Sequence, residues 1–455
     1  MRSADAILGT LKDFQVNTVE YAFSRLWDEE DPVDRFLVAD EVGLGKTMVA
    51  KGLVAKTVER LQRQRRRNIN IVYASSNAHI ARQNLSRLNA VGASELRHAD
   101  RLTLLPTALG HVEKNRVNFI SLTPGTSLET GNSLGRGDER ALLYRMVAEV
   151  LGEATVASDG WIEMFRGNKI ADNFRWDVEQ IRPEDISRGV LTKFARAFKK
   201  AKGPRGRALK EELAVTAAQF EPLRAMGMFF RRNRTIDESL KSSRNRLIGT
   251  LRNLVAGVSL EFLKPDLIIL DEFQRFKTLL DPTTESSTPA QELAQQLFTA
   301  QGAKLLLLSA TPYKMFTLPN DPEGNEHYSD FLATVEFLAG PASAKKVSAG
   351  LATMRSGIYQ AKTGSTEEAH DKLRTGREQV EKELRRVMSR TERLAETDDR
   401  NGMLVNKELG GSQLVPDDVR GWLTVDGVRR RLGVPYDGFE YWRSSPYPLS
   451  IMNQD

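Results

Sequence analysis

The sequence predicts an α/β protein in which a parallel sheet is wrapped by helices and interrupted by an all-helical insertion. Short apolar runs of strand length alternate with amphipathic segments of helical periodicity, which is typical of parallel strands joined by crossover helices. Polar motifs follow several of these runs, where a parallel sheet places its ligand-binding edge. Between Gly131 and Ser243 the patterns are helical and no convincing strand occurs.

The composition favours a soluble globular protein of two or three domains. The chain has 455 residues, of which 40% are hydrophobic and 28% charged, with a net charge of +6. We expect no transmembrane helix, because no apolar run reaches about 18 residues. The N-terminus also lacks the basic start and apolar core of a secretory signal. Cysteine is absent, which excludes disulfides and thiolate zinc sites and suits a reducing cytoplasm.

Residues 1–130 are expected to hold the first part of the sheet domain. Apolar residues recur at helical spacing in three segments, and short stretches of mostly apolar residues separate or follow them. The expected elements are, in chain order, a helix over 8–26, a strand over 36–39, a helix over 47–61, a strand over 69–74, a helix capped by Asn77, and a strand over 117–122.

Residues 131–243 are expected to form the helical insertion, and residues 244–395 the second part of the sheet domain. The later strands are expected at 266–270 and 304–308, after a helix over 244–260. Helices are expected at 328–338 and at 367–394, the latter broken near Gly376 because glycine disfavours helix interiors. After Thr397 the pattern weakens into loops, and we interpret residues 396–455 as a connecting region.

Basic residues gather in three places, although the net charge alone does not indicate nucleic acid. The clusters are Arg63 with Arg65–Arg67, Lys199–Arg207, and Arg231 with Arg232 and Arg234. Each can be a solvated face of a helix or loop, which is the ordinary role of a charge run. A basic patch that contacts nucleic acid is the alternative.

The strongest local signal is a phosphate-binding loop over Asp40–Thr47, because it follows a predicted strand and opens a predicted helix. Gly43 and Gly45 would let backbone N–H groups approach phosphate oxygens at a helix N-terminus. Lys46 would reach the β- and γ-phosphates, and the Thr47 hydroxyl would ligate Mg²⁺. The general pattern has glycine where this chain has Asp40, so an accidental turn is the competing interpretation.

Two further motifs follow apolar runs. Asp271 and Glu272 come directly after a buried strand, so Asp271 would hold Mg²⁺ through water and Glu272 would orient and deprotonate the attacking water. Ser309 and Thr311 follow the next strand, where their hydroxyls can hydrogen-bond to these carboxylates and sense the nucleotide state. A polar turn at the end of a strand, or a capped turn before a helix, is the structural alternative for each motif.

This motif series resembles that of superfamily-two helicases and translocases, and Asp40 in place of the first glycine is similar to the Swi/Snf group. The resemblance covers residues 8–130 and 244–395 and implies a RecA-like lobe with Lys46, Asp271 and Glu272 as catalytic residues. It implies that Gln15 binds adenine and that Gln274, Ser309 and Thr311 couple hydrolysis to motion. Ser75, Ser76 and Thr123 resemble residues that contact the DNA backbone, and Arg390-Thr391 resembles the end of the first lobe.

The resemblance also implies a second RecA-like lobe that supplies an arginine finger, and no such motif occurs after Pro312. We therefore expect this chain to hold the first lobe, with the second in the remaining polypeptide or in a partner chain. The expected ligands are ATP, Mg²⁺ and double-stranded DNA. The expected setting is the cytoplasm of a prokaryote, at the nucleoid, in DNA repair, transcription recycling or phage defence.

Two other functions remain open from the sequence. An AAA-type chaperone or regulatory ATPase would share the phosphate loop and the paired acids, although the Ser-Ala-Thr-Pro motif and Gln15 disfavour it. A non-catalytic scaffold that binds nucleotide and needs a partner lobe is the other alternative, and the intact Lys46, Asp271 and Glu272 disfavour that.

Overall fold

The computed structural model describes residues 3–28, 30–89, 96–99, 101–112, 115–128, 133–229, 236–276, 288–309, 326–363, 366–392 and 416–433. The chain divides into two compact units, residues 1–396 and 397–455. In the second unit, the described segment contains one helix, α19 (Pro416–Leu432). No helix within the described ranges is long and apolar enough to cross a membrane.

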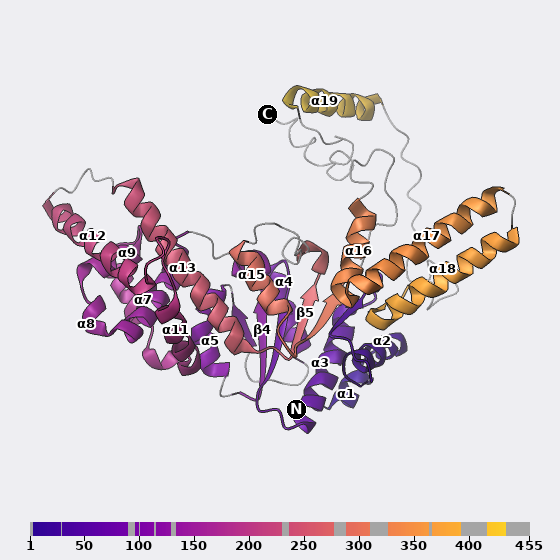
Figure 1. Ribbon diagram of the computed structural model, residues 1–455, viewed down its shortest axis with the longest axis horizontal. Coiled ribbons are helices and arrows are strands. Elements are labelled where there is room, and N and C mark those ends of the chain that lie inside the picture. Colours follow the sequence, from indigo (N-terminus) through magenta and orange to yellow (C-terminus); the bar gives the residue numbers. More distant parts are fainter. Residues whose placement is uncertain are drawn as a thin grey trace. The chain divides into compact units, whose positions relative to one another are not determined.

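The first unit is built on a parallel sheet with the order β3-β4-β2-β5-β6-β1-β7 (Figure 1). Six of these described strands have four to six residues and the seventh has two. All their pairings are parallel, which confirms the predicted α/β fold with a parallel sheet. The strands are β1 (Arg35–Val38), β2 (Ile69–Ala74), β3 (Leu96–Ala99), β4 (Val117–Leu122), β5 (Leu267–Asp271), β6 (Lys304–Leu308) and β7 (Met388–Ser389).

Helices cover both faces of the sheet because successive strand residues point to opposite faces. On one face, Phe36, Val38 and Ile71 pack against α1 (Ala4–Leu8), α2 (Asp13–Phe23), α3 (Lys46–Arg63) and α4 (Ala78–Leu88). On the other face, Leu37 and Val72 join a larger core with α5 (Leu105–Val112), α15 (Pro289–Phe298) and helices from residues 137–263. Both faces are buried, which explains why most residues of these strands are apolar.

The described part of residues 133–263 is helical apart from an isolated bridge between Lys202 and Ala208. Its apolar residues belong to the same continuous core as one face of the sheet, so this segment packs on the sheet directly. The helices are α7 (Gly137–Leu151), α8 (Glu153–Val156), α9 (Asp159–Arg166), α10 (Ala171–Glu179), α11 (Arg188–Lys200), α12 (Leu209–Phe229) and α13 (Glu238–Leu263).

The predicted helix over 8–26 is wrong in its continuity. α1 ends at Leu8, α2 begins at Asp13, and a π-helical turn over Ser24–Asp28 follows. Gly9 caps α1, and its N–H donates to the carbonyls of Asp5 and Ile7. Both pieces present apolar residues to the same core, so the helical spacing in the sequence continues across the break.

The predicted helix over 367–394 is also corrected. α18 (Thr366–Val387) passes through Gly376 without a break, and it pairs with an unpredicted helix, α17 (Pro341–Thr363). A Cβ on Gly376 would lie 2.7 Å from the carbonyl oxygen of Gly350, so glycine permits close approach of the two helices here. The helix α16 (Glu326–Ala339) confirms the prediction for 328–338. α19 corrects the expectation of loops after Thr397.

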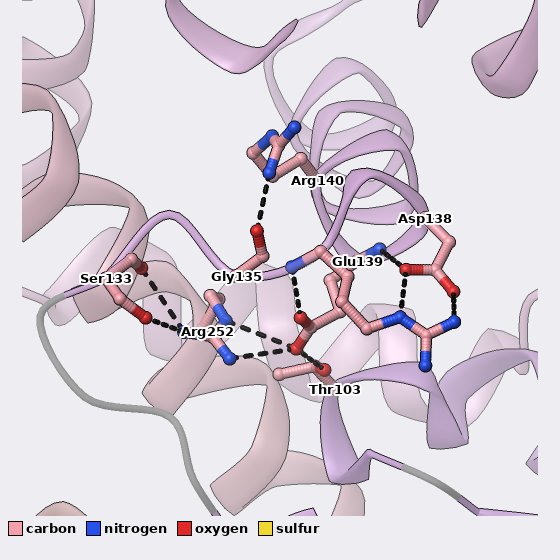
Figure 2. Close-up of polar contacts among 8 residues, drawn as sticks. Thr103, Ser133, Gly135, Asp138, Glu139, Arg140 and Arg252 are labelled. Atoms are coloured by element: carbon pink, nitrogen blue, oxygen red, sulfur yellow. Dashed lines mark hydrogen bonds and ion pairs between the residues drawn. The ribbon is translucent and has the colours of Figure 1, made fainter. Parts of the chain in front are cut away.

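A buried ion pair joins α13 to α7 (Figure 2). Glu139 and Arg252 are both fully buried, and Arg252 Nη2 lies 3.0 Å from Glu139 Oε1. Thr103 Oγ1 donates to the same carboxylate at 2.5 Å, and the backbone N–H of Arg136 donates at 2.6 Å. Burial alone would raise the pKa of Glu139, but these hydrogen bonds and the Arg252 charge outweigh it and hold the pKa below its ordinary value.

Arg252→Met is expected to lower the free energy of unfolding by about 3–5 kcal/mol, because Glu139 would remain as an unpaired charge in the core. Replacing both partners, as Arg252→Met with Glu139→Leu, should cost less, since no uncompensated charge remains. Denaturant titration measures both losses. Arg374→Met is the control, because the Arg374–Asp371 pair is exposed and should contribute below about 1 kcal/mol. A loss below 1 kcal/mol for Arg252→Met would contradict the prediction.

Candidate nucleotide-binding site

Three neighbouring strands bring most of the predicted site residues to one edge of the sheet. In the order β5-β6-β1, Leu308 of β6 pairs with Asp271 on one side and with Val38 on the other. The loop after β1, Ser309 after β6 and the end of β5 therefore lie next to one another at the carboxyl edge. This edge is where open parallel sheets bind ligands.

The predicted phosphate loop connects β1 to α3. Gly43 and Gly45 have φ values of 89° and 81°, a left-handed conformation that glycine adopts without steric cost. Gly45 is the N-cap of α3, so the free N–H groups of the first helical turn begin at Lys46. A Cβ on Gly45 would lie 2.7 Å from Gln15 Nε2, which gives a second reason for glycine at this position.

The Lys46 amine lies against this loop. Nζ donates hydrogen bonds to the carbonyl oxygens of Asp40 and Glu41, at 3.0 and 3.2 Å. Burial lowers the pKa of Lys46, while the nearby charges of Asp40 and Asp271 oppose this shift. Lys46 and Asp271 are therefore close enough to interact electrostatically. Thr47 occupies the first turn of α3 and is half-buried.

Gln15 supports the loop from α2. Its side chain is 7% exposed, and its Nε2 donates to the carbonyl oxygen of Leu44 at 2.9 Å. Its Oε1 accepts a hydrogen bond from the Lys12 N–H at 3.1 Å. The structure thus places Gln15 in direct contact with the loop, with both ends of the amide bonded to backbone. Its role toward adenine stays a prediction.

Asp271 at the end of β5 is held by two side chains that sequence reasoning missed. The Tyr73 hydroxyl, from β2, donates to Asp271 Oδ2, and Asn84 Nδ2 of α4 donates to Tyr73 Oη at 2.8 Å and to Asp271 Oδ2 at 3.4 Å. Burial raises the pKa of Asp271, and the hydrogen bond from Tyr73 opposes that shift. The signal available in the sequence is a tyrosine inside the predicted strand over 69–74.

Glu272 has a strained backbone and an accessible side chain. Its φ is 54°, a left-handed conformation that costs a non-glycine residue about 1–3 kcal/mol. Its Oε2 accepts a hydrogen bond from Ser76 Oγ at 3.3 Å and lies 2.9 Å from Arg275 Nε. Ser76 follows β2, so the carboxylate links the ends of two adjacent strands.

Asp40 binds the backbone near the end of the first unit, at Thr391, to the phosphate loop. It is fully buried, and Oδ1 accepts a hydrogen bond from the Thr391 N–H at 2.8 Å. The Thr391 carbonyl accepts the Glu41 N–H at 3.1 Å, which extends the β1–β7 pairing. Burial raises the pKa of Asp40, against the effects of Thr391, Lys46 and Arg390. The predicted helix around Arg390 is therefore wrong, because α18 ends at Val387 and Arg390 follows a strand beside the loop.

The remaining predicted residues lie at neighbouring strand ends. Ser309 is buried, and its hydroxyl has no hydrogen-bond partner within the described ranges. Gln274 lies in a 3₁₀ turn after Glu272. Thr311 lies outside the described residues. Ser75 and Thr123 directly follow β2 and β4 and are buried, whereas Ser76 is partly exposed.

The side chains present fit a Mg²⁺–nucleotide complex. The described residues hold no group of three or more His, Asp or Glu side chains that would bind a metal ion without help. Magnesium is ordinarily bound through one or two carboxylates, waters and substrate phosphates, so such a group is not required. Thr47 and Asp271 would provide the protein's share, and the Lys46 amine and the α3 N-terminus would face the phosphates.

The geometry establishes an α/β protein with a parallel sheet. At the carboxyl edge of that sheet lie a glycine-containing loop, a half-buried lysine and a carboxylate that Tyr73 and Asn84 orient. No protein-family model matches this chain, and no curated protein matches it in sequence, so its classification depends on this site.

Proposed function

We propose that residues 1–396 form the ATP-binding and ATP-hydrolysing lobe of a DNA helicase or translocase similar to the Swi/Snf group of superfamily two. The supporting observation is the placement of Lys46, at the start of α3 after β1, and of Asp271, at the end of β5, on either side of Ser309, where their charges act on each other. A loop at a helix N-terminus, a lysine and a carboxylate are what a nucleoside triphosphate with Mg²⁺ requires.

In this proposal Lys46 exchanges the carbonyls of Asp40 and Glu41 for the β- and γ-phosphate oxygens. Magnesium, when bound by Thr47 and Asp271, neutralises phosphate charge. Tyr73 and Asn84 keep the Asp271 carboxylate in one orientation, so little reorganisation is needed on binding. Preorganised groups of this kind lower the barrier because they are already placed before charge develops.

Glu272 is proposed as the general base. It accepts a proton from water as the water oxygen bonds to the γ-phosphorus, and the bond between that phosphorus and the β–γ bridging oxygen breaks to release ADP and phosphate. To act in this way the carboxylate must leave Arg275 and Ser76. Gln274, Ser309 and Thr311 are proposed to pass the nucleotide state to Ser76 and the DNA.

A second RecA-like lobe, from the same polypeptide or a partner chain, is proposed to complete the site. Residues 1–396 hold one parallel sheet within the described ranges, and a motor needs two lobes that open and close on DNA. The proposed location is the cytoplasm, at the nucleoid.

The proposal predicts that the chain binds duplex DNA without sequence preference and that binding weakens steeply with salt. Phosphate contacts release counterions, and six to ten of them lower affinity by roughly 10³–10⁵ between about 50 and 200 mM salt. Fluorescence anisotropy with two unrelated duplexes measures the affinity and its salt slope. An AAA-type ATPase or a nucleotide-binding scaffold would instead bind neither duplex at low salt, and that result would reject the DNA motor.

A further inference from the structure

A basic surface covers α11 and the hairpin that follows it. Residues 188–210 contain nine lysines and arginines and no aspartate or glutamate. Eight of the nine are exposed, and Lys193 is half-buried and pairs with Glu261. We define the α11 basic surface as Arg188, Arg196, Lys199, Lys200, Lys202, Arg205, Arg207 and Lys210.

The fold holds this surface in place. Val190, Phe194 and Phe198 bury one face of α11 in the large core, so its basic residues project from the other side. The hairpin after α11 is closed by backbone hydrogen bonds from Gly203 N–H to the Arg207 carbonyl at 2.7 Å and from Leu209 N–H to the Ala201 carbonyl at 2.9 Å. Arg205 and Arg207 are therefore presented from an ordered turn.

The charges of this surface are unusual because the residues that the structure describes do not neutralise them. None of its eight side chains forms an ion pair with a residue in the described ranges. The charged helix α18, with six lysines and arginines and six acidic residues, behaves differently: Lys372 pairs with Glu368, Arg374 with Asp371, and both Arg377 and Arg385 with Glu381. A solvated helix face ordinarily resembles α18, with pairs at i,i+3 and i,i+4.

We propose that the α11 basic surface binds the phosphate backbone of duplex DNA, as a contact separate from the strand-end residues of the nucleotide site. This inference depends on the proposed DNA motor and identifies a second part of its DNA-binding surface. From Arg188 to Lys200 the helix extends about 18 Å, at about 1.5 Å per residue. At about 3.4 Å per phosphate on each strand, that length matches about five phosphates.

The chemistry of the surface favours nucleic acid over a membrane. Helices that bind membranes place large apolar side chains at the lipid interface. The exposed large apolar residues of the described ranges, such as Ile170 and Trp176, lie outside residues 188–210. Arginine forms paired hydrogen bonds with phosphate oxygens, which suits a backbone contact.

The test compares two variants in which five cations become glutamine. The surface variant is Arg196→Gln, Lys199→Gln, Lys200→Gln, Arg205→Gln and Arg207→Gln. The control variant has the same change in net charge on α18 and is Lys372→Gln, Arg374→Gln, Arg377→Gln, Lys382→Gln and Arg385→Gln. Anisotropy with a labelled 30-base-pair duplex measures affinity over a salt series, and thermal melts and ATP binding are measured for each variant.

The surface variant is expected to bind the duplex at least about 30-fold more weakly at 100 mM salt. Its salt slope should fall by about three to five, since each lost phosphate contact removes about 0.9. The control should change affinity by less than about threefold, and both variants should keep the wild-type melting temperature and ATP affinity.

Equal losses in both variants would mean a general effect of net charge and would overturn the inference. If wild-type protein binds DNA and the surface variant binds equally well, the inference fails while the proposed motor stands. If wild-type protein binds ATP but no duplex DNA, both the inference and the proposed motor fail. Tighter binding to anionic vesicles or to duplex RNA than to DNA would assign the surface to that other partner and overturn the inference.

Discussion

Glu272→Gln is expected to bind ATP with unchanged affinity and to lower the rate of hydrolysis by roughly 10²–10⁴, the usual contribution of general base catalysis. Glutamine has the same shape as glutamate and lacks its basicity, so binding contacts remain while proton transfer from water is lost. The exposed side chain carries no core packing, so the change should leave stability nearly intact. Single-turnover hydrolysis of labelled ATP, with ATP binding measured in parallel, provides the two readouts.

Lys46→Ala is expected to abolish ATP binding itself, whereas Glu272→Gln keeps binding and loses hydrolysis. Removing the amine takes away the main cation for the phosphates, so nucleotide affinity should be lost at concentrations where Glu272→Gln is saturated. Lys51→Ala, on the same helix and five residues further on, is the matched control and should bind ATP normally. Glu378→Gln, on α18, is the control for Glu272→Gln. Wild-type hydrolysis in Glu272→Gln would remove Glu272 from the proposed role.

The strands that carry the site can be predicted from the sequence, because strand formation there depends on residues adjacent in the chain. The strands at 69–74, 117–122 and 304–308 are confirmed at the predicted residues, since each is a short stretch of mostly apolar residues. Asn77 caps α4 as predicted, with its side chain accepting the N–H groups of His79 and Ile80. Parallel strands align their carboxyl ends, so the polar motifs that follow them had to lie at one edge.

The contacts that orient the site were not predictable, because they join residues far apart in sequence. Tyr73 contacts Asp271 across two adjacent strands, and an aliphatic residue at position 73 would fit the strand pattern equally well. Asp40 departs from the general motif in the sequence, but its contact with Thr391 depends on a two-residue strand. Such a strand has too little periodicity to detect.

The helices near the end of the first unit show a different reason why prediction from sequence fails. α17 and α18 form a pair in which Gly350 and Gly376 meet backbone to backbone. Glycine inside a charged helical pattern was interpreted as a break, which is its intrinsic preference. The close packing of the pair outweighs this cost, because only a residue without a side chain lets the two backbones approach.

Residues 1–455 are expected to hydrolyse ATP at less than about 0.01 s⁻¹, with or without duplex DNA. A typical enzyme turns over at about 10 s⁻¹, and an arginine that stabilises the transferring phosphoryl group contributes roughly 10³–10⁵ in rate. That factor corresponds to about 4–7 kcal/mol of activation free energy. In the proposed motor the second lobe supplies this arginine from across the cleft, whereas Lys46, Thr47, Asp271 and Glu272 come from this chain.

The expectation of slow hydrolysis would be wrong if an arginine of this chain stabilised the transferring phosphoryl group, and Arg390 is the candidate. β7 places it beside the phosphate loop, and its charge acts on Asp40. Its guanidinium forms an ion pair, however, in which Nε lies 2.8 Å from Glu392 Oε1. We therefore expect Arg390→Lys to change the slow hydrolysis by less than twofold. DNA-stimulated turnover of several per second that falls at least 100-fold in Arg390→Lys would show that this chain supplies its own arginine, and the second lobe would then not be required for chemistry.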